Sequence, residues 1–317
     1  MKIKKIQEID YQYGQEESLK KLLYRSKEPI VLKIESFSEK YNLDYFEKLL
    51  CGEIGYDTYE NNLWKSYQSN NYETVIKQMK NNMAYRIFGL ILPRQLSAEI
   101  ENHVPLWQKI PLRPRYFNKK LKVAYFLGGK GAHTEIHFDR EHCCILHLCL
   151  SGKKQFLLFT EDQNKYIYKL PYIGDSLIEF GYPWDALCHQ FPRLNQAEGY
   201  NIILEPGDML FLPKNCWHYT TYLEASAAAS YVFYPNKLLQ FYGYFTGYFF
   251  MGYKEANGFK IADWPFFKKF SERYAVAEGK KKFLFKLIEV ISYAFLLPII
   301  SIITKISFLL KPRRTFY

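Results

Sequence analysis

The residues best suited to chemistry in this chain are two histidines and one aspartate. His137 and Asp139 lie two positions apart in the stretch TEIHFD, and His218 lies in a later stretch, LEPGDMLFLPKNCWHYTTYL. Because side chains alternate along a β-strand, a strand at TEIHFD would direct His137 and Asp139 to the same face. Two imidazoles and one carboxylate on one side of a metal leave its opposite positions open. That arrangement suits non-haem Fe(II) with O₂ and a bidentate co-substrate.

The segments that must position these residues are short β-type runs separated by turns. From residue 122 onward the runs are VAYFL, TEIHF, CILHLCL, QFLLF, NIIL, MLFL and WHYTTYL. The turn at Pro206-Gly207 combines the fixed φ and the permissive φ that a type II turn requires. Many short strands with such turns predict a small sandwich or barrel whose mouth holds the metal.

The flanking segments predict helices and one further strand. The stretches SLKKLLYRS and YNLDYFEKLLC have helical spacing, and IVLKI between them is a strand candidate. Residues 51–121 are mixed and polar, with one expected helix, LSAEIENHVPLW, ending near Pro105. We therefore expect an oxygenase-type domain over 1–235, an aromatic-rich helical region over 236–279 and a basic, hydrophobic helix over 280–317.

The composition is typical of a folded, mainly β protein. The 317 residues are 48% hydrophobic, ample for a buried core, and 18% aromatic, a share that favours wide β-surfaces. None of the six cysteines forms a CxxC pair, and no apolar run follows the basic amino terminus. These features argue against a disulfide framework and a secretory leader and predict a cytoplasmic protein.

The positive charge belongs mainly to the carboxy-terminal tail. The chain has a formal charge of +11, of which residues 280–317 carry +7 and the first 279 residues +4. The larger part of the chain therefore has no marked electrostatic footprint for nucleic acid, which remains a weaker alternative partner.

Several motifs together resemble a known family. HFD, the GKK turn and EPGDMLFLPKNCWH occur in the order and spacing typical of jumonji C (JmjC) and cupin-like Fe(II)/2-oxoglutarate oxygenases, and the resemblance covers roughly residues 15–235. It implies a mainly β fold with flanking helices, a double-stranded β-helix. It also implies that His137, Asp139 and His218 bind Fe(II), that 2-oxoglutarate is the co-substrate and that succinate and CO₂ are released.

The resemblance further implies residues that hold the co-substrate. Thr134 and Lys154 match the family's hydroxyl and lysine, and Ser230 matches a later polar position loosely. About two extra residues, HCC, lie between HFD and the GKK turn, so the choice between Lys154 and Lys153 stays open. A buried ammonium is costly unless paired, and a dicarboxylate supplies that partner. The apolar residues expected to exclude water are Phe126, Phe138, Leu146, Phe156 and Trp217.

Other candidates near the site have plainer interpretations. His133, His142 and His147 are expected to be surface or supporting imidazoles and not a fourth ligand. The cysteines at 143, 144 and 149 are expected to be small buried side chains.

The tail allows three interpretations. Its helices could form a homodimer interface, pack against the core or meet a membrane. Residues 290–310 would be about 31 Å long as a helix, with cations near both ends. Pro298 and Lys305 argue against a simple membrane span and favour a helix at the interface or one packed on protein.

Two classes of function follow. The first is an Fe(II)/2-oxoglutarate-dependent hydroxylase acting on a protein side chain, an RNA base or a small metabolite. The second is a non-catalytic cupin-like module that binds a ligand or partner at a membrane or as a dimer. Turnover of 2-oxoglutarate distinguishes them.

Overall fold

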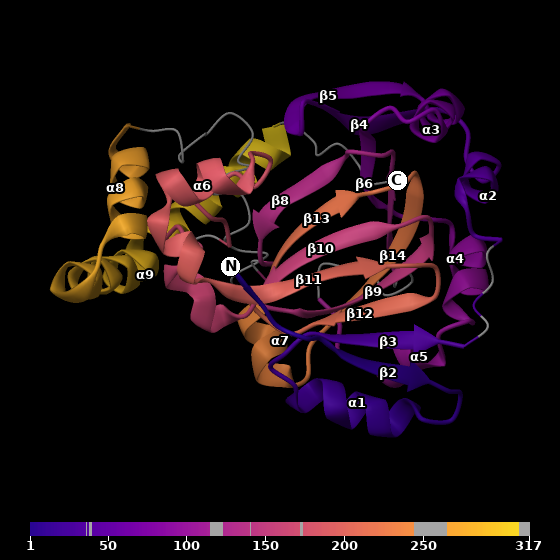
Figure 1. Ribbon diagram of the computed structural model, residues 1–317, viewed down its shortest axis with the longest axis horizontal. Helices are drawn as coiled ribbons and strands as arrows, with labels where there is room; N and C mark the ends of the chain where they lie inside the picture. The colour runs from indigo at the N-terminus through magenta and orange to yellow at the C-terminus, as the bar shows by residue number, and fades with distance from the viewer. Residues whose placement is uncertain are drawn as a thin grey trace.

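The computed structural model describes residues 1–35, 37, 40–114, 123–139, 141–171, 174–243 and 265–310. Two β-sheets form the body of the molecule, one lying in front of the other in Figure 1. The smaller sheet has the order β1 (Lys2–Ile3), β11 (Glu198–Leu204), β10 (Lys154–Phe159), β13 (Trp217–Tyr222) and β8 (His133–His137). The larger has the order β2 (Gln7–Tyr11), β3 (Ile30–Ile34), β12 (Asp208–Leu212), β9 (Cys144–Ser151), β14 (Ser226–Phe233), β7 (Ala124–Gly128), β6 (Tyr85–Leu90), β4 (Glu53–Glu60) and β5 (Leu63–Asn71).

The space between the sheets is filled by apolar side chains from both. Phe156 and Leu158 of β10 share one buried cluster with Ile145 of β9 and Leu210 of β12. A second and larger cluster covers the other face of the nine-stranded sheet. The helices over that face are α1 (Glu16–Arg25), α2 (Leu43–Glu47), α3 (Tyr72–Lys80), α4 (Arg94–Glu101) and α5 (Pro105–Lys109). The expected mainly β architecture with flanking helices is confirmed, but among the described residues the sheets face each other as an open pair and not as a closed barrel.

The turn at Pro206-Gly207 forms as its sequence predicts. Gly207 has a φ of 91°, and the amide of Asp208 donates to the carbonyl of Glu205 at 2.9 Å. A positive φ favours glycine, so the turn directs β12 back beside β9. β13, which carries His218, follows directly.

The region 51–121 holds more regular structure than its polar composition suggests. β4 and β5 form a hairpin, and β6 joins this hairpin to β7. The turn residues Asn61 and Asn62 both have positive φ, 52° and 61°, as a two-residue hairpin turn requires. The sequence predicted only one helix in this region and none of these strands. The predicted helix near Pro105 is in fact α4 followed by α5, with Pro105 at the first position of α5.

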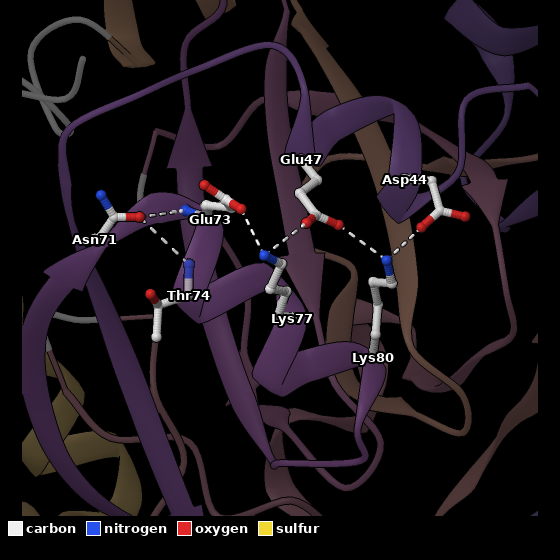
Figure 2. A network of polar contacts seen from close by, with 7 residues as sticks. All are labelled: Asp44, Glu47, Asn71, Glu73, Thr74, Lys77 and Lys80. Carbon is white, nitrogen blue, oxygen red and sulfur yellow. Dashed lines mark hydrogen bonds and ion pairs between the residues drawn. The ribbon is translucent and has the colours of Figure 1, made fainter.

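Polar contacts on the surface join α2 to α3 (Figure 2). The side chain of Asn71 accepts hydrogen bonds from the amides of Glu73 and Thr74 and so caps α3. Lys80 pairs with Glu47 at 2.9 Å and also with Asp44 of α2. Exposed pairs of this kind contribute about 0–1 kcal/mol each. They fix how α2 meets α3 more than they stabilise the fold.

Helical elements gather at the end of the molecule that lies away from α2 and α3 (Figure 1). They are η1 (Glu161–Lys165), α6 (Trp184–Gln190), η2 (Pro192–Gln196), α7 (Lys237–Gly243), α8 (Pro265–Val276) and α9 (Gly279–Leu310). Residues 244–264 and 311–317 of the predicted helical regions lie outside the described residues. Within the described part, no helix combines the length and the apolar character needed to cross a membrane.

Candidate metal centre

Strands β8 and β13 bring three ligand-type side chains together. His137 ends β8, and His218 lies directly opposite it on the antiparallel strand β13. Asp139 follows β8. One ligand atom from each of the three lies within 4.8 Å of the others, and Nε2 of His137 is 4.0 Å from Oδ1 of Asp139. We call this set the triad. The sequence predicts that these three residues converge, but β8 ends at His137, so the residues after the strand, and not strand alternation, place Asp139.

Backbone carbonyls orient both imidazoles of the triad. Nδ1 of His137 donates to the carbonyl of Glu135 at 2.7 Å, and Nδ1 of His218 donates to the carbonyl of Cys216 at 3.1 Å. A carbonyl oxygen only accepts, so each Nδ1 carries a proton, and in the neutral imidazole Nε2 is then the nitrogen with the lone pair. Nε2 is therefore the atom through which each imidazole would bind a cation.

Burial keeps His218 in the form that binds metal. Loss of hydration, followed by the neighbouring His137, lowers the pKa of His218 to about 4. The side chains of His137 and Asp139 are 24% and 30% exposed, whereas His218 is only 8% exposed. The donor set is two imidazole nitrogens and one carboxylate oxygen, half-open to solvent, and it fits a divalent ion with further positions on the open side.

Farther along the same strands lies a buried lysine. Lys154 begins β10 opposite Tyr222 of β13, and Leu158 of β10 stands opposite His218. The side chain of Lys154 is 2% exposed, and its Nζ lies 4.5 Å from the ring centre of Tyr222 and 5.3 Å from that of Phe156. Burial lowers the pKa of Lys154 to about 7. Within the described residues no carboxylate pairs with it.

Comparison with known proteins places this arrangement in a family. Residues 30–238, more than half of the chain, match the family described as the cupin-like domain. The chain belongs to the cupin-like family. HSPB1-associated protein 1 of Mus musculus is 33% identical over 104 residues, 31% of this chain and 21% of that relative. The rat protein of the same name is 30% identical over 101 residues, with the same shares of the two chains.

Relatives whose names carry JmjC are similar over a comparable stretch. JmjC domain-containing protein D of Dictyostelium discoideum is 25% identical over 111 residues, 33% of this chain and 23% of the relative. The resemblance to JmjC-type, cupin-like proteins is thereby confirmed. The chain matches only about a fifth to a quarter of the length of these three relatives.

The start of β10 directs the two candidate lysines to opposite sides. The turn before β10 places Gly152 at a φ of 67°, and the two lysines that follow it point in opposite directions. Lys153 is exposed and pairs with Glu205 at 2.9 Å. Lys154 points between the sheets. That Lys154 binds a co-substrate stays a prediction.

His147, which the sequence predicts to be a surface or supporting imidazole, joins Lys154 to Ser230, a pair of contacts that the sequence did not predict. Nζ of Lys154 lies 3.1 Å from Nε2 of His147, and Nδ1 of His147 lies 2.7 Å from Oγ of Ser230. An ammonium only donates, so Nε2 accepts, and Nδ1 then carries a proton and donates to Ser230. The signal was present in CILHLCL, where a polar residue interrupts a fully buried strand, but the period of the strand alone assigns it no partner.

Thr134 has its own cationic neighbour. Thr134 pairs with Thr220 across β8 and β13 and accepts a hydrogen bond from Nη1 of Arg86. Nη2 of Arg86 is held by Oδ2 of Asp57 at 2.8 Å. The hydroxyl of Thr220 is buried without a hydrogen-bond partner, as expected for a polar atom that faces a ligand site.

The remaining expectations have mixed outcomes. Phe138 packs edge to face on Trp217 beside the triad, and Phe156 lies against His147. Leu146 instead packs in the cluster on the outer side of the larger sheet, so it does not shield the site.

His133 is buried against Tyr59 and bonds Glu135, whereas His142 bonds Asn215. The three cysteines near the site, Cys143, Cys144 and Cys149, are all free and buried, as expected.

Proposed function

We propose that this chain is an Fe(II)- and 2-oxoglutarate-dependent oxygenase that hydroxylates a protein side chain. The observation that carries the proposal is the buried Lys154, which has no carboxylate partner among the described residues and lies in line with the triad. Four strand positions, about 13 Å, separate Lys154 from Leu158, the residue opposite His218. A lysine side chain and a five-carbon diacid laid end to end bridge that interval. One carboxylate would meet the ammonium, and the keto-acid end would reach the triad.

The residues present fit both groups. His137, Asp139 and His218 would hold the ion through two imidazole nitrogens and one carboxylate oxygen. Lys154 would bind the distal carboxylate, with the hydroxyls of Thr134 and Thr220 as hydrogen-bonding groups on the adjoining strands. Bound iron and keto acid would supply the oxidising power that places one oxygen atom of O₂ on the target and releases succinate and CO₂.

The protein's own contribution is to orient the ligands and exclude water. Carbonyl acceptors fix the two imidazoles, and the buried Phe138 and Trp217 form an apolar wall next to the triad. Water exclusion strengthens the attraction between Lys154 and an anion. The open side of the triad, at the half-exposed His137 and Asp139, is where a target side chain would enter.

A protein target is favoured over the other substrate classes by two features. Relatives over this stretch include proteins named HSPB1-associated protein 1, a name that states association with another protein. Apart from the tail the chain carries only +4, a weak attraction for RNA. RNA bases and small metabolites remain the alternative targets, and a cupin-like module without turnover is the alternative function.

An anaerobic titration tests the proposal. Adding Fe(II) and then 2-oxoglutarate should produce a weak visible metal-to-ligand charge-transfer band, and admitting air should yield succinate. The variant His218→Ala should lose both signals. The matched control, His189→Ala on the exposed surface of α6, should keep both. Metal binding without succinate would identify a non-catalytic module. Addition of one oxygen atom to peptides, detected by mass spectrometry, would then define the substrate.

A further inference from the structure

Helices α8 and α9 form a hairpin that packs through polar contacts. The hydroxyl of Tyr274 in α8 donates to Oε2 of Glu289 in α9 at 2.5 Å. Nζ of Lys282 donates to the carbonyl of Tyr274 at 2.6 Å and lies 3.8 Å from the centre of its ring. Lys282, Phe285 and Glu289 are spaced at i, i+3 and i+7, so they mark the inner face of α9.

The same inner side attaches the hairpin to the rest of the protein. Nη2 of Arg193 in η2 donates to the carbonyl of Ala275 at 2.6 Å, and its guanidinium stacks over Tyr168 at 4.1 Å. Ala275 is 1% exposed and belongs to the apolar cluster beneath α6. The inner side of the hairpin is therefore occupied by the protein itself.

Among the side chains of α9 that the structure describes, nine large apolar ones are exposed on its outer side. The side chains there are between 41% and 72% exposed. They are Phe283, Leu284, Leu287, Ile288, Val290, Ile291, Phe295, Ile299 and Ile302. At 100° per residue these positions cover an arc of about 180° around the helix. Soluble helices normally turn such an arc towards the core.

The width of this arc bears on what covers it. A helix of a second copy meets its partner along an a/d seam, which is narrower than the stripe that faces a globular core. A seam of that kind would leave the two flanks of a half-circle arc in water. A lipid surface covers the whole arc, because acyl chains fill in around a helix that lies in the interface.

Charge on and beyond α9 matches an anionic surface. Lys280 and Lys281 are exposed at the start of α9, and Lys311, Arg313 and Arg314 follow its end in the sequence. α9 has 32 residues and is about 48 Å long, and the sequence has cationic residues both before and after its apolar stretch. Cations at both ends favour a helix lying in the plane of the headgroups, where each contributes to binding anionic lipid.

We propose that α9 lies in the interfacial plane of an anionic membrane, with its outer arc against the acyl chains and its inner face holding the cupin-like domain through α8 and Arg193. The occupant is a lipid surface with negatively charged headgroups. This attachment does not depend on the oxygenase reaction, because none of its residues belongs to the triad or contacts Lys154.

Vesicle flotation with the full chain tests the proposal. The probes are vesicles of phosphatidylcholine alone and of phosphatidylcholine mixed with phosphatidylglycerol. The wild-type chain should float with the mixed vesicles and bind the neutral ones more weakly, and added salt should reduce the difference. A triple variant, Phe283→Glu, Leu287→Glu and Ile291→Glu, should lose binding at least about tenfold. The matched control, Ile3→Glu with Ile203→Glu, changes equally exposed residues elsewhere and should bind normally.

A second pair of variants tests the charge. Lys280→Glu with Lys281→Glu should weaken binding to mixed vesicles at least about fivefold, whereas Lys21→Glu with Lys27→Glu, both exposed in the amino-terminal part, should not. Failure of the wild-type chain to float, or equal loss in the controls, would overturn the proposal. So would a dimer in light scattering that the triple variant converts to a monomer, because a second copy would then cover the arc. Folding of each variant is checked by circular dichroism.

Discussion

The cupin-like body and the α8–α9 hairpin distribute charge in opposite ways. In the body, the ammonium of Lys154 is buried among aromatic rings while apolar side chains fill the space between the sheets. In the hairpin, Lys282 and Glu289 face inward and the large apolar side chains face outward. Among the described residues, each region therefore lacks a partner of complementary character: an anion beside Lys154, and an apolar layer over α9.

The buried Lys154 and the exposed face of α9 give different kinds of evidence for function. Burying a charge without a counter-charge costs free energy, and a fold keeps such a group when a ligand offsets that cost. Each large apolar side chain that stays exposed lacks the stabilisation of about 1.5–3 kcal/mol that its burial would contribute. The first imbalance lies at an interior site and points to a small ligand. The second extends along a helix and points to a large surface.

The largest expected effect is at the triad and leaves the hairpin unchanged. In Asp139→Ala only two nitrogens remain for the metal, so succinate formation should fall at least about 100-fold. Vesicle binding should match the wild type, because Asp139 lies outside the hairpin. The control Asp185→Ala, exposed on α6, should keep both properties. Loss of vesicle binding in Asp139→Ala would show that the two regions are not independent.

Replacing the buried lysine should separate stability from binding. Lys154→Met keeps the length of the side chain and removes a charge that has no carboxylate partner among the described residues. The ligand-free protein should therefore gain about 1–4 kcal/mol in free energy of unfolding at pH 6, measured in urea. Binding of 2-oxoglutarate should weaken by about 100-fold, since a paired buried charge is lost. The matched variant Lys153→Met, at an exposed position, should change neither.

The contribution of Lys154 to stability should depend on pH. The pKa of Lys154 is about 7 in the folded protein, below its ordinary value of 10.5, so the unfolded chain binds more protons between these values. The contribution of Lys154 to stability is thus most unfavourable below pH 7 and improves as the pH rises towards 10.5. Lys154→Met should lack this rise. At pH 8, binding of 2-oxoglutarate should take up protons, seen by calorimetry in buffers of different ionisation enthalpy; no uptake would contradict an anion beside Lys154.

The supporting imidazole should have a smaller effect. His147→Leu removes the group that lies between Lys154 and Ser230, so the ammonium loses its fixed orientation but keeps its charge. The KM for 2-oxoglutarate should rise about three- to tenfold, with kcat nearly unchanged, because the loss is in binding. Ser230→Ala should have a weaker effect in the same direction. An equal fall in kcat with no change in KM would place His147 in another role.

The sequence predicted the parts of this molecule in which local chemistry determines geometry. HFD and WH, with the PGD turn between them, suffice to bring His137 and His218 onto neighbouring strands, with Asp139 just after β8. The inward direction of Lys154 follows from strand alternation once the turn at Gly152 is known. The sequence alone could not decide between Lys153 and Lys154. The position of the Gly152 turn relative to the extra residues HCC determines which of the two lysines faces inward.

Contacts between side chains far apart in the chain could not be predicted from the sequence. Arg86 reaches Thr134 from a strand 48 positions earlier, and His147 reaches Ser230 across 83 positions. The β4–β5 hairpin was missed because β5 is mostly exposed and polar and β4 buries only Tyr56 and Thr58, so neither strand has a run of alternating apolar residues. The direction in which α9 turns its apolar arc depends on Arg193 and Tyr274, which no local pattern connects to it.

The smallest expected effect is at the junction of the two regions. Arg193→Met removes the hydrogen bond to the carbonyl of Ala275 and the stacking on Tyr168. The ion pair with Glu278 adds little, because that carboxylate side chain is 72% exposed. The loss should be about 1–2 kcal/mol and local. Amide exchange should therefore speed up in α8 and the first turns of α9, with the sandwich unchanged, while Arg273→Met, exposed on α8, should have no effect. Faster exchange throughout the sandwich would mean that Arg193 supports the body and not the attachment of the hairpin.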